Sequence, residues 1–482
     1  MFDITKLNRF LFTVEKPIYK VSINKKLMWT GIVLVVFYLM SSQLFGRVYG
    51  VAEGAGQQFK ALQMLLGSSF GTLMTLGIGP LVTSSIILQL LIGSKIIDWD
   101  LNEPEQKEKY DTVQKLSAIA LCFIEAVAFV LGGAVPPKSP DVFTIVIVVI
   151  QLAFGGLIVI LLDEIVSKWG IGSGISLFIA AGVAREIFIQ LFSPCMASTV
   201  AGCILPPPGT EPIGKFWAFL LSSFRDRMFT QAFFAFLPML TTVIVYLIVI
   251  YAQGISVDIP LQFGSMRGFG RRWSLKLFYT SNIPVILTAA LLANFQLLSG
   301  MMAKSTTEDP NIRCSLLGCV QQVQGGSSQP ISGAIYYISA PSNFLSDIFN
   351  GLLTNQLALR AVIYMSFMIG CSIIFSVFWV STSGMDAESV AEQVTSIGMR
   401  IPGYRSNPQI VRQVLNKYIP PLAVLGGAAI GFLAAFADFT GAIGTGTGIL
   451  LTVTIIYSFY EQLKSEPLEG AHPLIRKFLG EE

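Results

Sequence analysis

Histidine and charged residues are both scarce in this sequence. The chain of 482 residues contains one histidine and 13% charged residues, whereas soluble domains carry about 25% charged residues. The histidine, His472, lies next to Pro473 near the end of the chain, where it is most simply a solvated residue. No Ser/His/Asp or Cys/His set can therefore be assembled within the apolar segments, and the sequence predicts that the protein is not an enzyme.

A phosphate-binding lysine is missing from the two Gly-rich stretches, GIGSG at 170–174 and GTGTG at 444–448. A nucleotide loop needs such a stretch between a strand and a soluble helix. Neither stretch has that setting, so no nucleotide or other cofactor is predicted. Any driving energy must come from a partner or a gradient.

The six cysteines divide by position. Cys122 and Cys371 fall within predicted spans and are expected to be inert core residues. Four cysteines in predicted external loops would allow one or two disulfides in an oxidising compartment: Cys195, Cys203, Cys314 and Cys319. The spacing of the last two also resembles half of a zinc site, but no nearby histidine or second pair completes it, so no metal is predicted.

Long apolar runs are abundant, and hydrophobic residues make up 53% of the chain. A membrane-spanning helix needs about 20 such residues. The sequence predicts an all-α polytopic membrane protein with ten spans, at roughly 28–45, 71–92, 113–134, 142–162, 171–192, 232–252, 280–299, 360–381, 420–438 and 444–463.

Residues 56–93 form an unusual apolar stretch that is broken at Gly67-Ser68-Ser69 and again before Pro80. Residues 57–66 are too short to cross a bilayer, whereas the following piece is long enough. This pattern predicts a re-entrant half-helix followed by a full span. Irregular backbone at membrane depth requires surrounding protein or a water-filled cavity, so the stretch should border a pore or a substrate path.

The loop charges orient the predicted spans. Most of the 32 Lys and Arg residues fall on one side if both termini are cytoplasmic, as the positive-inside rule requires. Two groups of five spans also allow an inverted repeat. The expected organisation is an amphipathic cytoplasmic N-terminus (1–27), spans 1–5 (28–192), an external hinge loop (193–231), spans 6–10 (232–463) with long cytoplasmic loops at 252–279 and 381–418, and a cytoplasmic tail (464–482).

Both long cytoplasmic loops place Arg and Lys among Gly, Pro and an aromatic residue. These charges can simply enforce the topology, or they can form a docking surface for an anionic partner such as ribosomal RNA or an acidic motor protein. Within the membrane, Ile78 and Val82 are four residues apart, as are Ile175 and Ile179. Such aliphatic pairs fit either ordinary core packing or a narrow path that closes by dewetting.

Several stretches closely resemble the SecY family, the central subunit of the Sec protein-translocation channel. The matching stretches include GTLMTLGIGPLVTSSIILQLL (71–91), LDEIVSKWGIGSGISLFIAAGV (162–183), FYTSNIPVILTAALLANFQLL (278–298) and residues 418–463, whose YIPPL and YEQL segments look archaeal. The resemblance implies the SecY fold, with ten spans in two inverted halves hinged between spans 5 and 6 and a re-entrant plug half-helix.

The resemblance also implies roles for individual residues. The aliphatic pore ring corresponds to Ile78, Val82, Ile175, Ile179, Ile286 and Leu451. The plug corresponds to 57–66, with Gln57, Phe59, Leu62, Leu65 and Leu66. The polar cluster of the lateral gate corresponds to Thr83, Glu125 and Asn294. Ribosome-binding positions correspond to Arg267 and Arg405, with Arg271 and Arg272 close by and Ser265 where the family often has arginine.

The resemblance implies a protein-conducting channel that translocates secretory polypeptides and releases transmembrane segments laterally, driven by a ribosome or another partner. The implied partners are SecE/gamma-type and beta-type small membrane subunits, the ribosome, signal sequences, nascent polypeptides and lipid. The implied location is the plasma membrane, or the endoplasmic reticulum membrane in a eukaryote. The alternative is a secondary transporter, which would also show broken helices and an inverted repeat. Mid-span Glu125 could then be a protonation site, or it could simply be hydrogen-bonded between helices.

Overall fold

Ten long apolar helices make up the membrane part of the computed structural model. The structure describes residues 13–19, 21–42, 44–52, 63, 67–93, 96, 97, 99, 103–132, 134–139, 141–195, 198, 199, 202, 203, 212–225, 229–263, 270–280, 283–302, 304, 305, 312–322, 328–341, 344–349, 351, 354–396, 399, 400 and 408–465. Within these residues, the long helices are α2 (Ile23–Ser41), α4 (Gly79–Gly93), α5 (Pro104–Leu131), α6 (Val142–Trp169), α7 (Gly174–Phe192), α9 (Phe229–Gln253), α10 (Ile283–Met302), α13 (Asn355–Thr382), α15 (Pro408–Phe439) and α16 (Gly446–Ser465).

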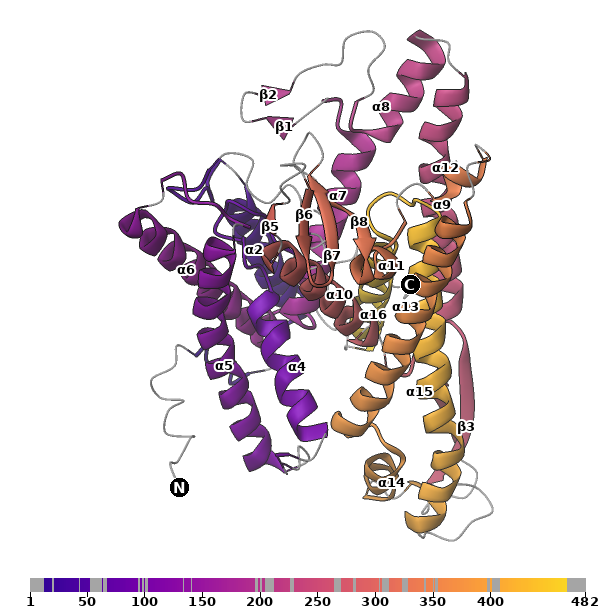
Figure 1. Cartoon of the computed structure of the whole chain (residues 1–482). Coiled ribbons are helices and arrows are strands. Elements are labelled where there is room, and N and C mark those ends of the chain that lie inside the picture. Colours follow the sequence, from indigo (N-terminus) through magenta and orange to yellow (C-terminus); the bar gives the residue numbers. More distant parts are fainter. Residues whose placement is uncertain are drawn as a thin grey trace.

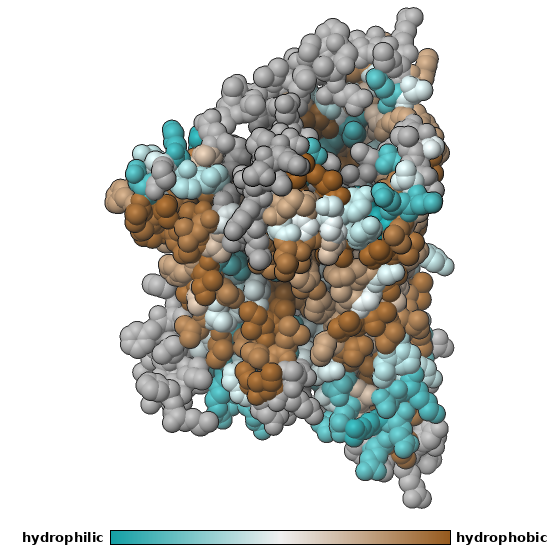
Figure 2. Space-filling view, in the orientation of Figure 1, coloured by the Kyte–Doolittle hydropathy of each residue, from teal (hydrophilic) through white to brown (hydrophobic). Residues whose placement is uncertain are grey.

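Seven helices are long and apolar enough to cross a membrane by themselves, and α4 and α10 contain shorter apolar helices. The exposed apolar side chains lie on the outer faces of these helices, for example Leu247 of α9 and Phe154 of α6. Figure 2 shows this surface as a brown band across the middle of the molecule, with hydrophilic residues gathered below it. The protein is therefore a multi-pass membrane protein.

The span predicted at 71–92 begins later than expected, because residues 71–78 form turns and α4 starts at Gly79. Gly77 has a positive φ of 54°, a conformation that ends the preceding turn and favours glycine. Pro80 then occupies the first turn of α4, where its missing N–H costs no helical hydrogen bond. Ile78 lies just before the helix, and its carbonyl accepts the first helical bond from Val82 N at 3.0 Å.

Helix α15 is longer than its predicted span, which was expected to start at 420. It begins at Pro408 and continues through Pro420 and Pro421, although an interior proline normally breaks or kinks a helix. Its first turns bury Val411, Leu415 and Ile419 against α14 (Ala387–Ser396), which contributes Val390 and Val394. This second small core outside the main one holds the N-terminal part of α15 in helical form.

The helices form two halves, α2–α7 and α9–α16, which lie side by side in Figure 1 in indigo to purple and in magenta to yellow. Equivalent hydroxyl pairs join equivalent helices in both halves. Ser84 of α4 lies 2.5 Å from Ser117 of α5, and Thr288 of α10 lies 3.3 Å from Ser372 of α13. Ser84 and Thr288 each lie four residues after the proline in the first turn of their helix. These two hydroxyl pairs thus occupy matching places in the two halves, as the predicted inverted repeat requires.

Strands occur in the connections outside the long helices, and the sequence analysis did not foresee them. On the side where α14 lies, β3 (Ser256–Phe263) pairs with β4 (Gly270–Lys276) and with β9 (Met399–Arg400), so one small sheet, the β3–β4–β9 sheet, joins the two long loops that were predicted to be cytoplasmic. On the opposite side, a four-stranded sheet contains β5 (Lys304–Ser305), β6 (Ile312–Ser315), β7 (Gly318–Gln322) and β8 (Ser328–Gly333).

The remaining short elements also lie in connections. They are β1 (Ser198–Thr199), β2 (Gly202–Cys203), α8 (Lys215–Leu220), a π-helical turn (Leu221–Arg225), α11 (Ala334–Ile338) and α12 (Phe344–Phe349). Helix α8 packs on α9 and α11 packs on α13, so these elements cover helix ends on the side of the four-stranded sheet.

Candidate functional site

The six aliphatic residues predicted to line a pore all belong to, or pack against, one large hydrophobic core that extends through both halves. Four are buried within it: Ile78, Val82, Ile179 and Leu451. Ile175 and Ile286 are half-buried and pack against it. Five of the residues lie in α4, α7, α10 and α16, two helices from each half, and Ile78 lies in the turn just before α4.

Four of these residues occupy equivalent positions in equivalent helices. Val82 follows Pro80 by two residues in α4, and Ile286 follows Pro284 by two residues in α10. Ile179 and Leu451 each lie five residues after the first residue of their helix, α7 or α16. The inverted repeat thus supplies an aliphatic side chain at the same position of each matching helix.

Such an arrangement has a clear chemical capacity. Aliphatic side chains that meet across a narrow path exclude water and can close it by dewetting. They offer no hydrogen bond or charge to a small polar solute. The core can therefore act as a seal around a chain, and it is a poor binding site for an ion or a metabolite.

A second candidate site lies where α4 faces the other half. Helix α4 packs against α5 and contacts α13. A narrow cleft between them is lined by residues of three helices, including Ile86 and Gln89 of α4, Leu287 of α10, and Phe375 and Phe378 of α13. A cleft with apolar walls between two helix pairs can admit an apolar helix if the pairs separate.

The predicted polar gate cluster is only partly brought together. Thr83 of α4 lies close enough to Glu125 of α5 for their side chains to interact. Asn294 lies exposed on α10, and among the contacts of the described residues none joins it to Thr83 or Glu125. Both alternatives for this mid-span carboxyl group, a hydrogen bond between helices and a protonation site, stay predictions.

The predicted plug residues lie outside the described part of the chain: Gln57, Phe59, Leu62, Leu65 and Leu66. The same holds for two of the predicted ribosome-binding residues, Arg267 and Arg405. The other two, Arg271 and Arg272, lie in β4 opposite Leu261 and Pro260 of β3.

Strand β9 places the second basic loop beside the first. Gln262 of β3 pairs with Arg400 of β9, which directly precedes the segment that contains Arg405. The β3–β4–β9 sheet thus gathers positively charged residues from loops that are more than a hundred positions apart in sequence. Since phosphate groups attract such a cluster, the sheet can act as a docking surface for an anionic partner.

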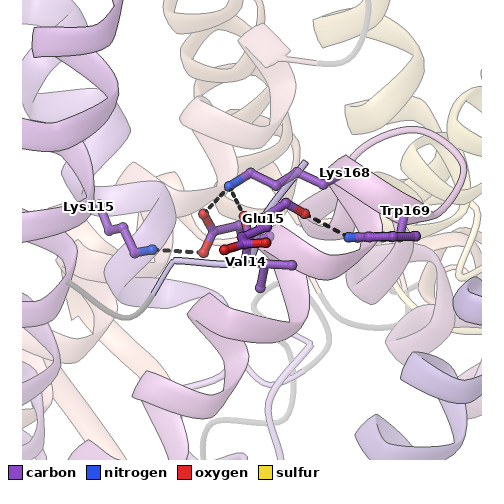
Figure 3. Close-up of polar contacts among 6 residues, drawn as sticks. Val14, Glu15, Lys115, Lys168 and Trp169 are labelled. Carbon is purple, nitrogen blue, oxygen red and sulfur yellow. Dashed lines mark hydrogen bonds and ion pairs between the residues drawn. The ribbon is translucent and has the colours of Figure 1, made fainter. Parts of the chain in front are cut away.

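Sequence reasoning missed a polar cluster at the end of α6. Glu164 accepts from Lys115 of α5 at 2.7 Å and from Lys168 at 2.5 Å. Lys168 also donates to the Val14 carbonyl at 2.5 Å, and Trp169 Nε1 donates to the Glu15 carbonyl at 2.9 Å. Figure 3 shows Lys168 between the carboxylate and the N-terminal segment. The four-residue spacing of Glu164 and Lys168 was the available signal, but it says nothing of the N-terminal segment.

Near the β3–β4–β9 sheet, a cavity of about 520 Å³ opens between β4, α14 and α16. Lys276 pairs with Glu461 in its wall and lies over the ring of Tyr457. Tyr279 donates to the Met385 carbonyl at 2.8 Å, and burial, together with the negative charge of Asp386, raises the pKa of Tyr279 to about 12. Its hydroxyl group is therefore neutral at physiological pH and serves as a hydrogen-bond donor.

On the opposite side, Cys314 and Cys319 form a disulfide across the β6–β7 pair, and Cys195 is also disulfide-bonded. The sequence had left a disulfide and a zinc site as alternatives for Cys314 and Cys319, and the bond settles the choice. Cys122 and Cys371 are free. Among the described residues, no group of three His, Cys, Asp or Glu side chains is placed to hold a metal ion.

Comparisons with known proteins agree with this geometry. The SecY family model matches residues 72–460. The chain is 41% identical to the protein translocase subunit SecY of Methanocaldococcus jannaschii over 97% of each protein. It is 37% identical to the protein transport protein SEC61 subunit alpha of Debaryomyces hansenii, over 95% of this chain and 94% of that protein.

Solved structures give the same result. A structure described as "The structure of a protein conducting channel" superposes with a TM-score of 0.78 at 40% identity, with 99% of both chains covered. The canine Sec61 chain from a ribosome-channel complex of the endoplasmic reticulum superposes with a TM-score of 0.75 at 38% identity, also with 99% of both chains covered. These matches favour a channel over the alternative of a secondary transporter, and they confirm the predicted non-enzymatic class. The chain belongs to the SecY family of protein-conducting membrane channels.

Proposed function

We propose that this protein is the pore subunit that translocates secretory polypeptides across the membrane and releases transmembrane segments sideways into lipid. The observation that carries the proposal is the set of six aliphatic residues from both halves in one core. Ile78, Val82, Ile175, Ile179, Ile286 and Leu451 form a ring that fits around an extended polypeptide while impeding ions. Its apolar side chains adapt to any sequence because they make no directional bonds.

The lateral gate lies between α4 and α5 on one side and α10 and α13 on the other. Thr83 and Glu125 would form the polar contact of this gate on the side of α4 and α5. Asn294 on the facing helix α10 would complete the polar cluster. An apolar signal sequence in the cleft lined by Ile86 and Phe378 would replace polar contacts and favour the open gate. Residues 57–66 would act as the plug on the external side at rest.

The β3–β4–β9 sheet would bind the ribosome. Arg271 and Arg272 lie in β4, and Arg267 and Arg405 belong to the same two loops. The similar canine protein is described in a complex with a ribosome, which supports a ribosome as the partner. A ribosome bound there would release the nascent chain above the cavity that Tyr279 and Lys276 line.

The proposal includes small SecE/gamma-type and beta-type membrane subunits as partners, which would cover part of the exposed apolar surface. The most exposed helix face belongs to α9, with Phe233, Leu247 and Tyr251 among its residues. We further propose that both termini lie in the cytoplasm. The membrane would be the plasma membrane, or the endoplasmic reticulum membrane if the source is a eukaryote.

Crosslinking to a stalled secretory nascent chain tests this function. A photoreactive residue at position 179 or 286 should crosslink to the chain. The matched control is position 188, because Phe188 lies on the same helix as Ile179 and its side chain is 65% exposed on the outer face. Crosslinks at position 188 with none at 179 and 286 would contradict the proposed path.

A further inference from the structure

Two aspartates bind the first turns of the pore helices at matching places in the two halves. Asp163 Oδ1 accepts from Ile175 N at 2.8 Å, and Asp438 Oδ1 accepts from Gly446 N at 2.7 Å. Each aspartate thus binds one of the first two N–H groups of a helix, α7 or α16, which have no partner within the helix itself.

The first residue of each capped helix must be glycine for this contact. A Cβ atom at Gly174 would lie 2.6 Å from Asp163 Oδ1, and one at Gly446 would overlap the backbone nitrogen of Asp438. Two such close approaches at equivalent positions show that the caps are built into both halves. They explain why the Gly-rich stretches, which have no nucleotide to bind, occur at these two places.

The caps set the position of the seal. Ile179 and Leu451 each lie five residues beyond the first residue of their helix, which is about 7.5 Å along the helix axis. Over so short a distance a helix moves as a rigid element. A shift of the capped end of α16 therefore shifts Leu451.

The two caps differ in one respect. Asp438 Oδ2 accepts a second hydrogen bond, from the hydroxyl of Tyr364 at 2.6 Å. Tyr364 is a buried residue of α13, the helix that contacts α4 across the gate. Among the described residues, the hydrogen-bond partners of Asp163 are backbone N–H groups of α7 alone. Only the second half thus joins a gate helix and a seal helix through one side chain.

We propose that Asp438 is a positioning residue that couples the lateral gate to the seal. Displacement of α13 by a signal sequence pulls Tyr364, the carboxylate transmits the displacement to the first turn of α16, and Leu451 leaves the ring. The gate and the seal then open together rather than one after the other. This inference rests on the proposed function, because it needs both a seal and a gate.

Chemical modification of a cysteine at position 451 tests the coupling in the full channel complex. In a Leu451→Cys chain with Cys122 and Cys371 replaced by alanine, an apolar signal peptide should raise the rate of modification by a water-soluble maleimide. Tyr364→Phe should reduce that rise about fivefold, the size expected from one lost hydrogen bond. A photoreactive residue at position 86 should report unchanged peptide binding at the gate.

Tyr38→Phe is the matched control. Tyr38 donates to the Ala181 carbonyl of α7 at 3.0 Å, so this variant also loses one hydroxyl bond to a pore helix but none to the gate. The rise should persist in Tyr38→Phe and in Asp438→Asn, whose amide can still bind both partners. An equal rise in Tyr364→Phe and the parent chain, with equal peptide binding, overturns the coupling while the channel function stands. No peptide binding and no nascent-chain crosslink in the parent chain would overturn the proposed function and the coupling with it.

Discussion

Ser84 of α4 and Ser117 of α5 lie 2.5 Å apart, Oγ to Oγ, and Ser84 also lies 2.8 Å from the Gln114 carbonyl oxygen. Ser84 is completely buried, so neither contact is shared with solvent. In the other half, Thr288 and Ser372 join α10 to α13 at the equivalent place. Each half therefore joins its own pair of helices, α4 with α5 or α10 with α13, through hydroxyl groups at the equivalent place.

The first prediction concerns these interhelical pairs. Thr288→Val keeps the side-chain shape but removes the bonding hydroxyl, and we expect a loss of about 1 kcal/mol in the free energy of unfolding. Denaturant unfolding of the purified protein in detergent would measure it. Thr452→Val is the control, since Thr452 bonds only the Gly448 carbonyl of its own helix. An equal loss in both variants would show that the bond between helices stabilises the protein no more than a bond within one helix.

The second prediction concerns the seal. Ile179→Asn combined with Ile286→Asn places two amides in the apolar ring, and water should then wet the closed path. Lowering a barrier by about 1.4 kcal/mol raises a rate about tenfold, and we expect a rise of that order in resting ion conductance. Planar bilayer recordings would measure the leak, with Ile179→Val plus Ile286→Val as the apolar control. Unchanged conductance in the polar variant would contradict a seal at this place.

The third prediction concerns the β3–β4–β9 sheet as the proposed docking surface. Arg271→Glu and Arg405→Glu should each weaken ribosome binding, because in the proposed complex each change removes a positive charge that attracts RNA phosphates. The dependence of the affinity on salt concentration should decrease by about one unit of slope for each arginine. Arg412→Glu is the control, since Arg412 pairs with Glu388 at 2.6 Å on α14. Affinity equal to that of the parent chain at physiological salt would refute the docking surface.

The fourth prediction concerns the N-terminal segment. Lys168 bonds the Val14 carbonyl and Trp169 bonds the Glu15 carbonyl. Replacing both, by Lys168→Met and Trp169→Phe, should release the segment and raise its rate of limited proteolysis severalfold. Lys109→Met, which removes an exposed pair with Glu105, should leave that rate unchanged. Equal protection in all three proteins would mean that other contacts hold the segment.

Much of the fold follows from the sequence because hydrophobicity is a local property. Ten apolar runs predicted ten long helices, and the spacing of Ile175 and Ile179 placed both on one side of a helix. The helix ends were less accurate. The start of α4 depends on backbone turns around Gly77, and the start of α15 depends on a small core with α14, and neither leaves a periodic signal in the sequence.

The candidate site was predicted less completely. The ring residues were predicted from the resemblance to the SecY family. Among the described residues, no contact joins Asn294 to Thr83 or Glu125. Strand β9 was missed because two residues are too few for a recognisable pattern, although it joins the two basic loops. A pairing that short exists only because β3 already lies beside it.

The sequence by itself determined the class of molecule, the number of spans and the apolar character of the seal, because each depends on composition and periodicity within a single segment. Only the tertiary structure decided how gate, seal and N-terminal segment are joined. Tyr364 and Asp438 are 74 positions apart, and Lys168 and Val14 are 154 apart. A hydrogen bond between two such residues depends on where whole helices pack, and no local pattern in the chain records it.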